Sequence, residues 1–203
     1  LEQHSPRSMV WQRRISDYYA SNKRYKEAIN ILKTLADTNA GSISIYTRLF
    51  NLYAEIKDNE NTKSTGILLC DIFAQKSLLE KSLNVLQKLL LLFPDDLEIL
   101  LKQADTVLSY EKANINTKVD SLKKVSSLLV KNNHITQAIS YLEKLCEIIP
   151  NDIETHTLLS TLYYKIENII NTLHHLQKLF SLQIQADATK DAFKTLNTIL
   201  SLD

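Results

Sequence analysis

Histidine and cysteine are the residues of this sequence whose side chains could bind a metal ion or take part in catalysis. The 203-residue chain has five histidines, at positions 4, 134, 156, 174 and 175, and two cysteines, Cys70 and Cys146. His174 and His175 are adjacent, so a helix would direct them about 100° apart and they could not share one ion. No histidine has a metal-ligand spacing with cysteine, aspartate or glutamate on one helical face. The sequence therefore predicts no metal site, and solvated or half-buried histidines.

The sequence shows no set of residues that could carry out a reaction. Catalysis needs a nucleophile, a base and an orienting group held together, and no motif supplies them. Gly41 and Gly66 are the only glycines, which excludes a glycine-rich phosphate-binding loop. Cys70 and Cys146 fall on apolar helical faces, where core thiols in a reducing compartment are expected rather than a disulfide. We therefore expect no catalytic residues, no cofactor and no enzymatic activity.

Composition favours an all-helical protein that binds neither nucleic acid nor membranes. With 2 Gly, 3 Pro and 44% hydrophobic residues, the chain has few residues suited to sheet turns or disordered linkers. Its 24 basic and 23 acidic residues nearly cancel, so no basic field would concentrate nucleic acid. The longest apolar stretch, residues 89–93, is far shorter than the roughly 20 residues of a membrane span. Because no signal peptide or transmembrane segment is recognisable, a cytoplasmic location is expected.

The elements that would position any site are helices, and residues 133–152 show their pattern most clearly. Apolar side chains recur there at helical spacing, at Ile135, Ala138, Ile139, Leu142, Leu145 and Cys146. Pro150 ends the run because a proline ring cannot continue a helix. The small Ala138 would allow this helix to cross the preceding one closely. Together the two helices resemble one unit of a tetratricopeptide repeat (TPR), a helical hairpin of about 34 residues.

A second stretch strengthens the TPR resemblance and sets the expected domain organisation. Residues 23–29, Lys-Arg-Tyr-Lys-Glu-Ala-Ile, are similar to the opening of the second helix of a TPR unit. The resemblance implies a right-handed α-α superhelix of about eleven antiparallel helices, in a single domain over residues 9–203. Its clear hairpins are 9–42, 63–96 and 119–152, followed by a weaker one at 153–186 and a capping helix at 187–203. Residues 1–8, which precede the only methionine, are interpreted as an expression leader ahead of a native start, and an internal fragment of a longer protein is the alternative.

The repeat phase is expected to be irregular in the middle of the chain. Ser82, Leu86 and Leu89 ahead of Pro94 mirror Ala138, Leu142 and Leu145 ahead of Pro150, at one constant spacing. This spacing exceeds the TPR period by about 22 residues, the length of one helix and its turn. It predicts single extra helices near 43–62 and 97–118, with a polar turn at 58–61 before a helix at 67–75. In the rival interpretation, the helices alternate regularly from the start.

The TPR resemblance implies a concave groove, lined by the first helix of each hairpin, that binds a segment of a partner protein. Its expected residues are Arg13, Asp17, Arg48, Asn51, Lys102, Asp105, Lys123, Lys124, Thr161 and Tyr164. Four helices would each contribute a cation, which could bind acidic side chains or a terminal carboxylate of the partner. Alternatively, these charges only solvate the helices, as exposed charges usually do.

The function that follows is that of a non-catalytic scaffold or adaptor that binds a protein or peptide in its groove. A peptide-sensing regulatory domain of a larger regulator is the alternative. A homodimer is compatible with the sequence, although nothing indicates one. Trp11 and Tyr18, or the apolar residues 90–93, could also bind another helix or a second copy. For residues 90–93, burial in the middle of the stack is the favoured interpretation.

Overall fold

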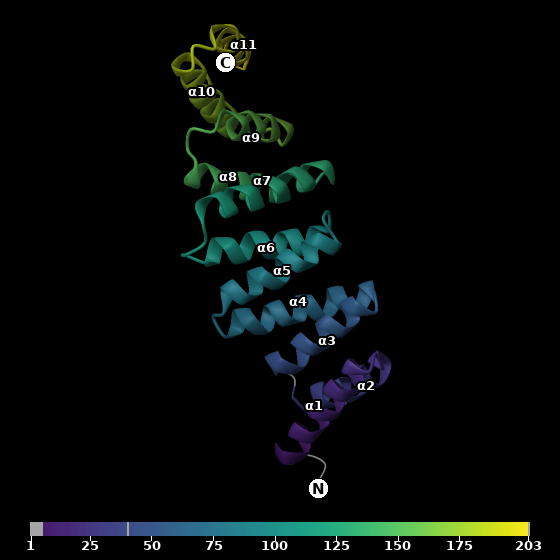
Figure 1. Cartoon of the computed structure of the whole chain (residues 1–203). Coiled ribbons are helices and arrows are strands. Elements are labelled where there is room, and N and C mark those ends of the chain that lie inside the picture. The colour runs from purple at the N-terminus through teal and green to yellow at the C-terminus, as the bar shows by residue number, and fades with distance from the viewer. Residues whose placement is uncertain (1–5, 40, 203) are drawn as a thin grey trace. The chain divides into compact units, whose positions relative to one another are not determined.

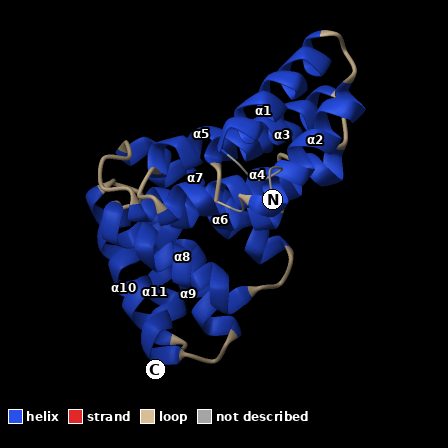
Figure 2. Ribbon diagram, turned by 90° about the horizontal axis from the view of Figure 1, so that it is seen from below, coloured by secondary structure: helices blue, strands red, loops and turns tan. Residues whose placement is uncertain are grey.

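The computed structural model describes residues 6–39 and 41–202, with side chains from residue 9 onward, and contains only α-helices and loops there (Figures 1 and 2). Residues 1–110 and 111–203 form two compact units, which are described separately. The first unit contains α1 (Pro6–Ser21), α2 (Tyr25–Thr38), α3 (Ile43–Glu55), α4 (Asn59–Gln75), α5 (Leu79–Leu92) and α6 (Leu97–Ser109). The second contains α7 (Ile115–Lys131), α8 (Ile135–Ile148), α9 (Ile153–Lys165), α10 (Ile169–Gln185) and α11 (Thr189–Leu200). The predicted all-helical fold of about eleven helices is confirmed.

The predicted leader, residues 1–8, is described only from residue 6 onward. Residues 1–5 of the predicted leader lie outside the described residues, and residues 6–8 form the start of α1. Pro6 is the first residue of that helix, a position where a missing backbone N–H costs nothing. No helix among the described residues is long and apolar enough to cross a bilayer. The single domain over residues 9–203 stays a prediction.

The core of each hairpin forms because apolar residues recur on one face of each helix. In α2, Ala28, Ile29, Leu32 and Leu35 are spaced by one, three and three residues, and all are buried. Three of them pack with Ile45, Leu49 and Tyr53 of α3 in one apolar cluster. Burying one large aliphatic side chain stabilises a fold by about 1.5–3 kcal/mol, so this face decides where α2 packs.

Helix α4 begins earlier than the sequence predicted. A polar turn was expected at residues 58–61 and a helix only from residue 67, but α4 starts at Asn59. Asp58 caps it, because its Oδ1 accepts a hydrogen bond from the backbone N–H of Asn61 at 3.1 Å. The first turn is helical despite its polar sequence, since Thr62 and Thr65 turn to the core and are buried. The prediction was wrong because it counted only large apolar residues as core.

Tight turns with one left-handed residue join the helices of each hairpin. In the first unit, Lys23, Lys57 and Ser77 have positive φ values of 59°, 57° and 57°, in the region that favours glycine. In the second unit, the equivalent residues are Asn133, Glu167 and Asp187. The residue after each one donates its backbone N–H to a carbonyl five residues earlier, as Leu78 does to Phe73 at 2.8 Å. None of these residues is glycine, so each turn carries some backbone strain.

Replacing Ser77 tests this strain. We expect Ser77→Gly to be neutral or to raise the free energy of unfolding by about 0.5 kcal/mol, because glycine adopts positive φ without steric cost. Ser77→Val should lower it by about 2 kcal/mol, since a β-branched residue fits that region worst. Urea denaturation followed by circular dichroism measures both. The matched control, Ser64→Gly within α4, should have the opposite sign and cost about 0.5 kcal/mol. A loss of stability in Ser77→Gly would contradict the left-handed turn.

The left-handed turn residues recur with the period of a TPR unit, and a larger repeat relates the two compact units. The spacing from Lys23 to Lys57 equals the spacing from Asn133 to Glu167, and both match the length of a TPR unit. In the larger repeat, α2, α3 and α4 recur at one constant offset as α8, α9 and α10, with the same lengths of 14, 13 and 17 residues. Helix α3 packs against α4 as α9 packs against α10. Helix α3 is therefore the first helix of a hairpin and not a lone insertion.

The repeat phase changes at α4, which has a tight left-handed turn at each end and packs against both α3 and α5. Gly66 allows this close packing. A Cβ atom at that position would lie 2.9 Å from Phe50 of α3 and 2.9 Å from Leu89 of α5. The larger repeat places Ser160 where Phe50 stands and Leu176 where Gly66 stands, and both line one cavity in the second unit. Each unit thus has one large and one small residue where these two helices cross. The large residue is on the first of the two helices in the first unit (α3) and on the second of them in the second unit (α10).

Candidate functional site

Three of the five cations expected in the groove are engaged in ion pairs with side chains of another helix. Arg48 of α3 binds Asp17 of α1, with Nε 2.9 Å from Oδ1 and Nη2 3.2 Å from Oδ2. Lys102 of α6 binds Asp71 of α4 at 2.5 Å. In the second unit, Nζ of Lys123 on α7 lies 3.0 Å from Oε2 of Glu154, which is in α9. It also lies 3.3 Å from Oδ2 of Asp152, which precedes α9.

One ion pair of each of these three cations has a spacing of 31 residues, which was not recognised from the sequence. It separates Asp17 from Arg48, Asp71 from Lys102, and Lys123 from Glu154. Each of these pairs joins a helix to the helix two elements further along the chain. The carboxylates raise the pKa of Lys123, whose bond to Glu154 is the main cause. A partner's carboxylate would have to compete with the carboxylates already bound to these cations.

Some other predicted residues lie apart from these pairs. Lys124 and Asn51 are exposed on α7 and α3. Arg13 is half-buried, and its Nε atom is buried without a hydrogen-bond partner among the described residues. Trp11 and Tyr18 are 61% and 64% exposed on α1.

Residues 90–93 are not buried as the sequence analysis favoured. Leu91 is 84% exposed and Leu92 is 50% exposed, while Leu89 before them is fully buried. The reason is that α5 ends at Leu92, so only the inward face of its last turn packs on other helices.

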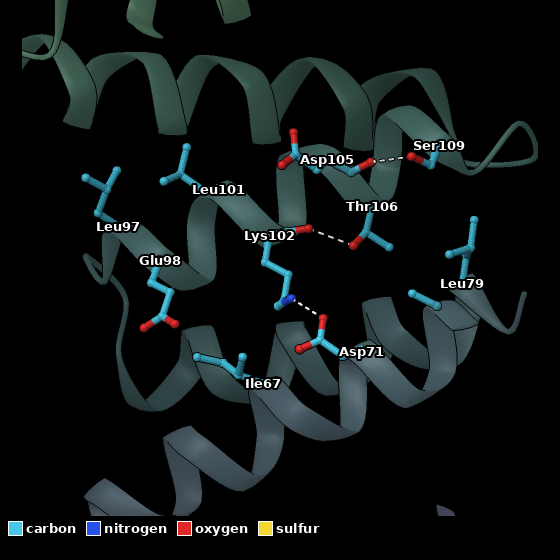
Figure 3. A pocket seen from close by; sticks show the side chains of 11 residues that line it. Ile67, Asp71, Leu79, Leu97, Glu98, Leu101, Lys102, Asp105, Thr106 and Ser109 are labelled. Carbon is cyan, nitrogen blue, oxygen red and sulfur yellow. Dashed lines mark hydrogen bonds and ion pairs between the residues drawn. The ribbon is translucent and has the colours of Figure 1, made fainter. Parts of the chain in front are cut away.

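A groove in the first unit lies between α4 and α6, with the start of α5 at one end (Figure 3). Its volume is about 780 Å³. The apolar part consists of Ile67, Leu79, Leu97 and Leu101, all of them half-buried large aliphatic residues. Its polar rim contains Lys102 and Asp105, two of the residues that the sequence assigned to a partner-binding groove. A groove of this size with an apolar floor is typical of a binding site.

The rim of this groove carries matched charges. The ammonium group of Lys102 reaches from α6 to Asp71 on α4, so this ion pair connects the two walls (Figure 3). Glu98 at one end binds Lys63 at 2.9 Å, and Lys63 also binds Asp96 at 2.6 Å. These two carboxylates raise the pKa of Lys63, with Asp96 as the larger cause. The electrostatics of the rim therefore favour neither an acidic nor a strongly basic ligand, and the apolar floor dominates.

Two smaller cavities lie among the described residues of the second unit, and each is lined by at least one residue that the sequence assigned to a groove. One, of about 340 Å³, is lined by Thr161 and Tyr164 together with residues of α10 and the end of α11. The other, of about 240 Å³, is lined by Lys123 and residues of α7, α8 and α9. Ser126 lines the second cavity, and its hydroxyl is buried without a hydrogen-bond partner among the described residues.

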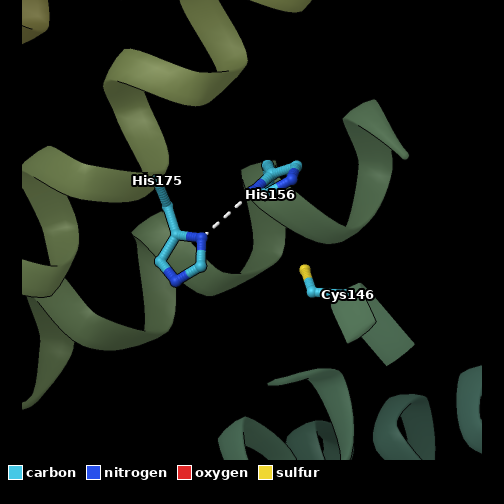
Figure 4. Close-up of side chains that lie close together, drawn as sticks. All are labelled: Cys146, His156 and His175. Atoms are coloured by element: carbon cyan, nitrogen blue, oxygen red, sulfur yellow. Dashed lines mark hydrogen bonds between the residues drawn. The ribbon is translucent and has the colours of Figure 1, made fainter. Parts of the chain in front are cut away.

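Cys146, His156 and His175 meet in the second unit, although they lie on three different helices, α8, α9 and α10 (Figure 4). The sulfur and one nitrogen of each histidine all lie within 4.8 Å of one another. The sequence analysis compared residues within single helices and therefore missed this cluster. The hairpin period could have indicated it, because it stacks α8, α9 and α10 in sequence.

Burial shifts the pKa of two members of this cluster, Cys146 and His175. It raises the pKa of the Cys146 thiol to about 11 and lowers the pKa of His175, where it outweighs the opposing effect of Glu143. Tyr163 stacks on the His175 ring with centroids 5.5 Å apart and donates its hydroxyl to Glu143 at 2.9 Å. Burial, and then this bond, raise the pKa of Tyr163 to about 12.

The helical hairpins and the period of their turns identify the architecture. The fold is TPR-like. No family model and no curated protein matches the sequence. Among solved structures, the chain is similar to PilW, a type IV pilus biogenesis factor, with 10% identity, coverage of 97% of this chain and 94% of that chain, and a TM-score of 0.40.

Two further solved structures are similar to this chain. The apo form of RapI has 14% identity, coverage of 92% of this chain and 74% of that chain, and a TM-score of 0.43. YrrB, described as a TPR protein with an unusual peptide-binding site, has 13% identity, coverage of 90% of each chain, and a TM-score of 0.33. Similarity at this level concerns the helical-hairpin architecture alone, so the function must be argued from the groove itself.

Proposed function

We propose that this chain is a non-catalytic protein-interaction scaffold that holds an apolar segment of a partner protein in the groove between α4 and α6. The observation that carries the proposal is the floor of that groove. Ile67, Leu79, Leu97 and Leu101 line about 780 Å³ of open space and remain partly exposed. Covering them would remove apolar surface from water, at roughly 25 cal/mol per Å².

The chemistry of the groove defines the kind of partner. A helix or extended segment that places two or three apolar side chains on the floor would fit a groove with helical walls. The cations Lys102 and Lys63 are bound to carboxylates, so acidic residues of the partner would have to displace Asp71 or Glu98. The expected acidic partner is thus less well supported than an apolar one, while Lys102 and Asp105 stay part of the proposed site.

The substitution Leu101→Glu tests the proposal. A carboxylate on the floor would be desolvated by the bound segment, so we expect binding of the partner to weaken at least about 30-fold, as for a central interface residue. The partner is first captured from the native extract with the unchanged chain, and the dissociation constant of the purified pair is then measured for both proteins.

The matched control is Lys88→Glu, an exposed position of α5 outside the groove lining. It introduces the same carboxylate and should change the dissociation constant less than about threefold. If Leu101→Glu and Lys88→Glu bound the partner equally well, the binding site would lie outside this groove and the proposal would be wrong. Circular dichroism of Leu101→Glu establishes that the helices are retained.

A further inference from the structure

The two histidines of the cluster in the second unit are held by their Nε2 atoms. His156 Nε2 lies 3.1 Å from the carbonyl oxygen of Pro150, and His175 Nε2 lies 3.1 Å from a carboxylate oxygen of Glu143. A carbonyl oxygen and a carboxylate oxygen only accept hydrogen bonds, so each Nε2 atom must carry the proton and donate it. Both rings are buried, with exposed fractions of 5% for His156 and 4% for His175.

When both rings are neutral, this arrangement leaves a lone pair on each of the opposite nitrogens. A neutral imidazole has one proton, so with Nε2 protonated each Nδ1 atom presents a lone pair. The two Nδ1 atoms face each other at 3.0 Å (Figure 4). Two bare acceptors at this distance repel each other and leave two buried polar atoms unsatisfied, which costs free energy. A cation between them would remove both problems.

Cys146 provides a third ligand atom beside the two histidines. Its sulfur lies within 4.8 Å of a nitrogen of each histidine, and its side chain is half-buried. We propose that Cys146, His156 and His175 bind one zinc ion, with the Cys146 thiolate and the two histidine nitrogens as ligands. The proton of the thiol leaves to solvent when the sulfur binds the metal. A fourth tetrahedral position is then open to water.

The geometry fits zinc better than the hard cations. Zinc takes nitrogen at about 2.0–2.1 Å and sulfur at about 2.3 Å, whereas magnesium and calcium require oxygen ligands. Two nitrogens on a tetrahedral zinc ion lie about 3.3 Å apart, close to the observed 3.0 Å. The sulfur must move about 1 Å closer to the two nitrogens. A rotation of the half-buried Cys146 side chain can supply this movement.

The groups around the histidines form the outer shell that such sites require. A metal-bound histidine usually donates its other N–H to a carboxylate or a backbone carbonyl, which orients the ring. Glu143 accepts such a bond from His175, and the Pro150 carbonyl accepts one from His156. Glu143 is in turn held by the hydroxyl of Tyr163 at 2.9 Å. Glu143 is therefore a positioning residue, and the ion would connect helices α8, α9 and α10.

Binding of cobalt and zinc to the whole chain, freed of metal with a chelator, tests the site. One cobalt ion should bind per chain. The complex should show the visible absorption of tetrahedral cobalt and a thiolate-to-cobalt band in the near ultraviolet. One equivalent of zinc should displace the cobalt. We expect a zinc dissociation constant below about 1 μM. Glu143→Gln should weaken zinc binding about tenfold and keep the thiolate band.

Matched variants separate this site from other histidines and thiols. Cys146→Ser should abolish the thiolate band and weaken zinc binding at least about 100-fold. The thiolate band and the zinc affinity should be unchanged in two control variants. These are Cys70→Ser, at the other cysteine, and His174→Gln, at an exposed neighbouring histidine. Cys146 is half-buried, so its replacement by serine should preserve the fold, which circular dichroism verifies. The site would be overturned if zinc did not bind, or if it bound equally to the native chain and Cys146→Ser. A proton shared between the two Nδ1 atoms would then account for their distance.

Discussion

Replacing Gly66 by leucine should lower the free energy of unfolding of the first unit by about 3 kcal/mol. A single Cβ atom at Gly66 would already lie 2.9 Å from both Phe50 and Leu89, and leucine adds three further carbon atoms. The gain in helix propensity over glycine, about 0.8–1 kcal/mol, is smaller than the cost of overpacking. Urea denaturation and hydrogen exchange of peptides from α3 to α5 measure the loss.

The second unit indicates how this loss could be relieved. There, Ser160 and Leu176 occupy the positions of Phe50 and Gly66. Phe50→Ser alone should cost about 3–5 kcal/mol, because it leaves a cavity. Combined with Gly66→Leu, it should cost at least about 2 kcal/mol less than the sum of the single changes. Additive costs would contradict the packing of α4 between α3 and α5. Ser64→Leu, on the exposed face of α4, should change stability by less than about 0.5 kcal/mol.

Truncating a core leucine at equivalent positions of the two units should have equal and large effects. Leu32 of α2 and Leu142 of α8 correspond in the larger repeat, and their exposed fractions are 0% and 1%. We expect Leu32→Ala and Leu142→Ala each to cost about 3 kcal/mol, the sum of lost apolar burial and a residual cavity. Hydrogen exchange should locate the first loss in α1–α3 and the second in α7–α9.

The control for this comparison is an exposed pair that also corresponds in the larger repeat. Asn30→Ala and Ser140→Ala lie on the outer faces of α2 and α8, and each should change stability by less than about 0.5 kcal/mol. If Leu32→Ala and Leu142→Ala differed by more than about 2 kcal/mol, the packing of the two hairpins would not be equivalent, whatever their matching helix lengths.

Local patterns were sufficient to predict most of the helices. The apolar spacing from Ile135 to Leu145 and the stop at Pro150 correspond to α8, which ends at Ile148. The start of α4 was missed because Thr62 and Thr65 form its buried face, and small polar residues give no hydrophobic signal. The division of the repeat at α4 was only partly foreseen, because the turn at Ser77 is recognised by its left-handed backbone and not by a glycine.

The candidate sites were harder to predict because their residues meet through tertiary packing. Lys102 was expected to present a free charge, but its partner Asp71 lies 31 residues earlier on another helix. The cluster of Cys146, His156 and His175 needs the positions of three helices, which spacing within one helix cannot supply. The apolar floor at Leu101 was likewise not distinguished from core residues by sequence.

Site-specific photocrosslinking tests the central claim, that the groove between α4 and α6 holds a partner protein. A benzophenone amino acid is placed at residue 101, on the groove floor, or at residue 88, on the exposed face of α5, and each protein is irradiated in the native extract. We expect one dominant crosslinked protein from position 101, absent from position 88 and suppressed by an excess of the unchanged chain. Crosslinks from position 88 alone, or none from position 101 while the chain still captures a partner, would contradict it.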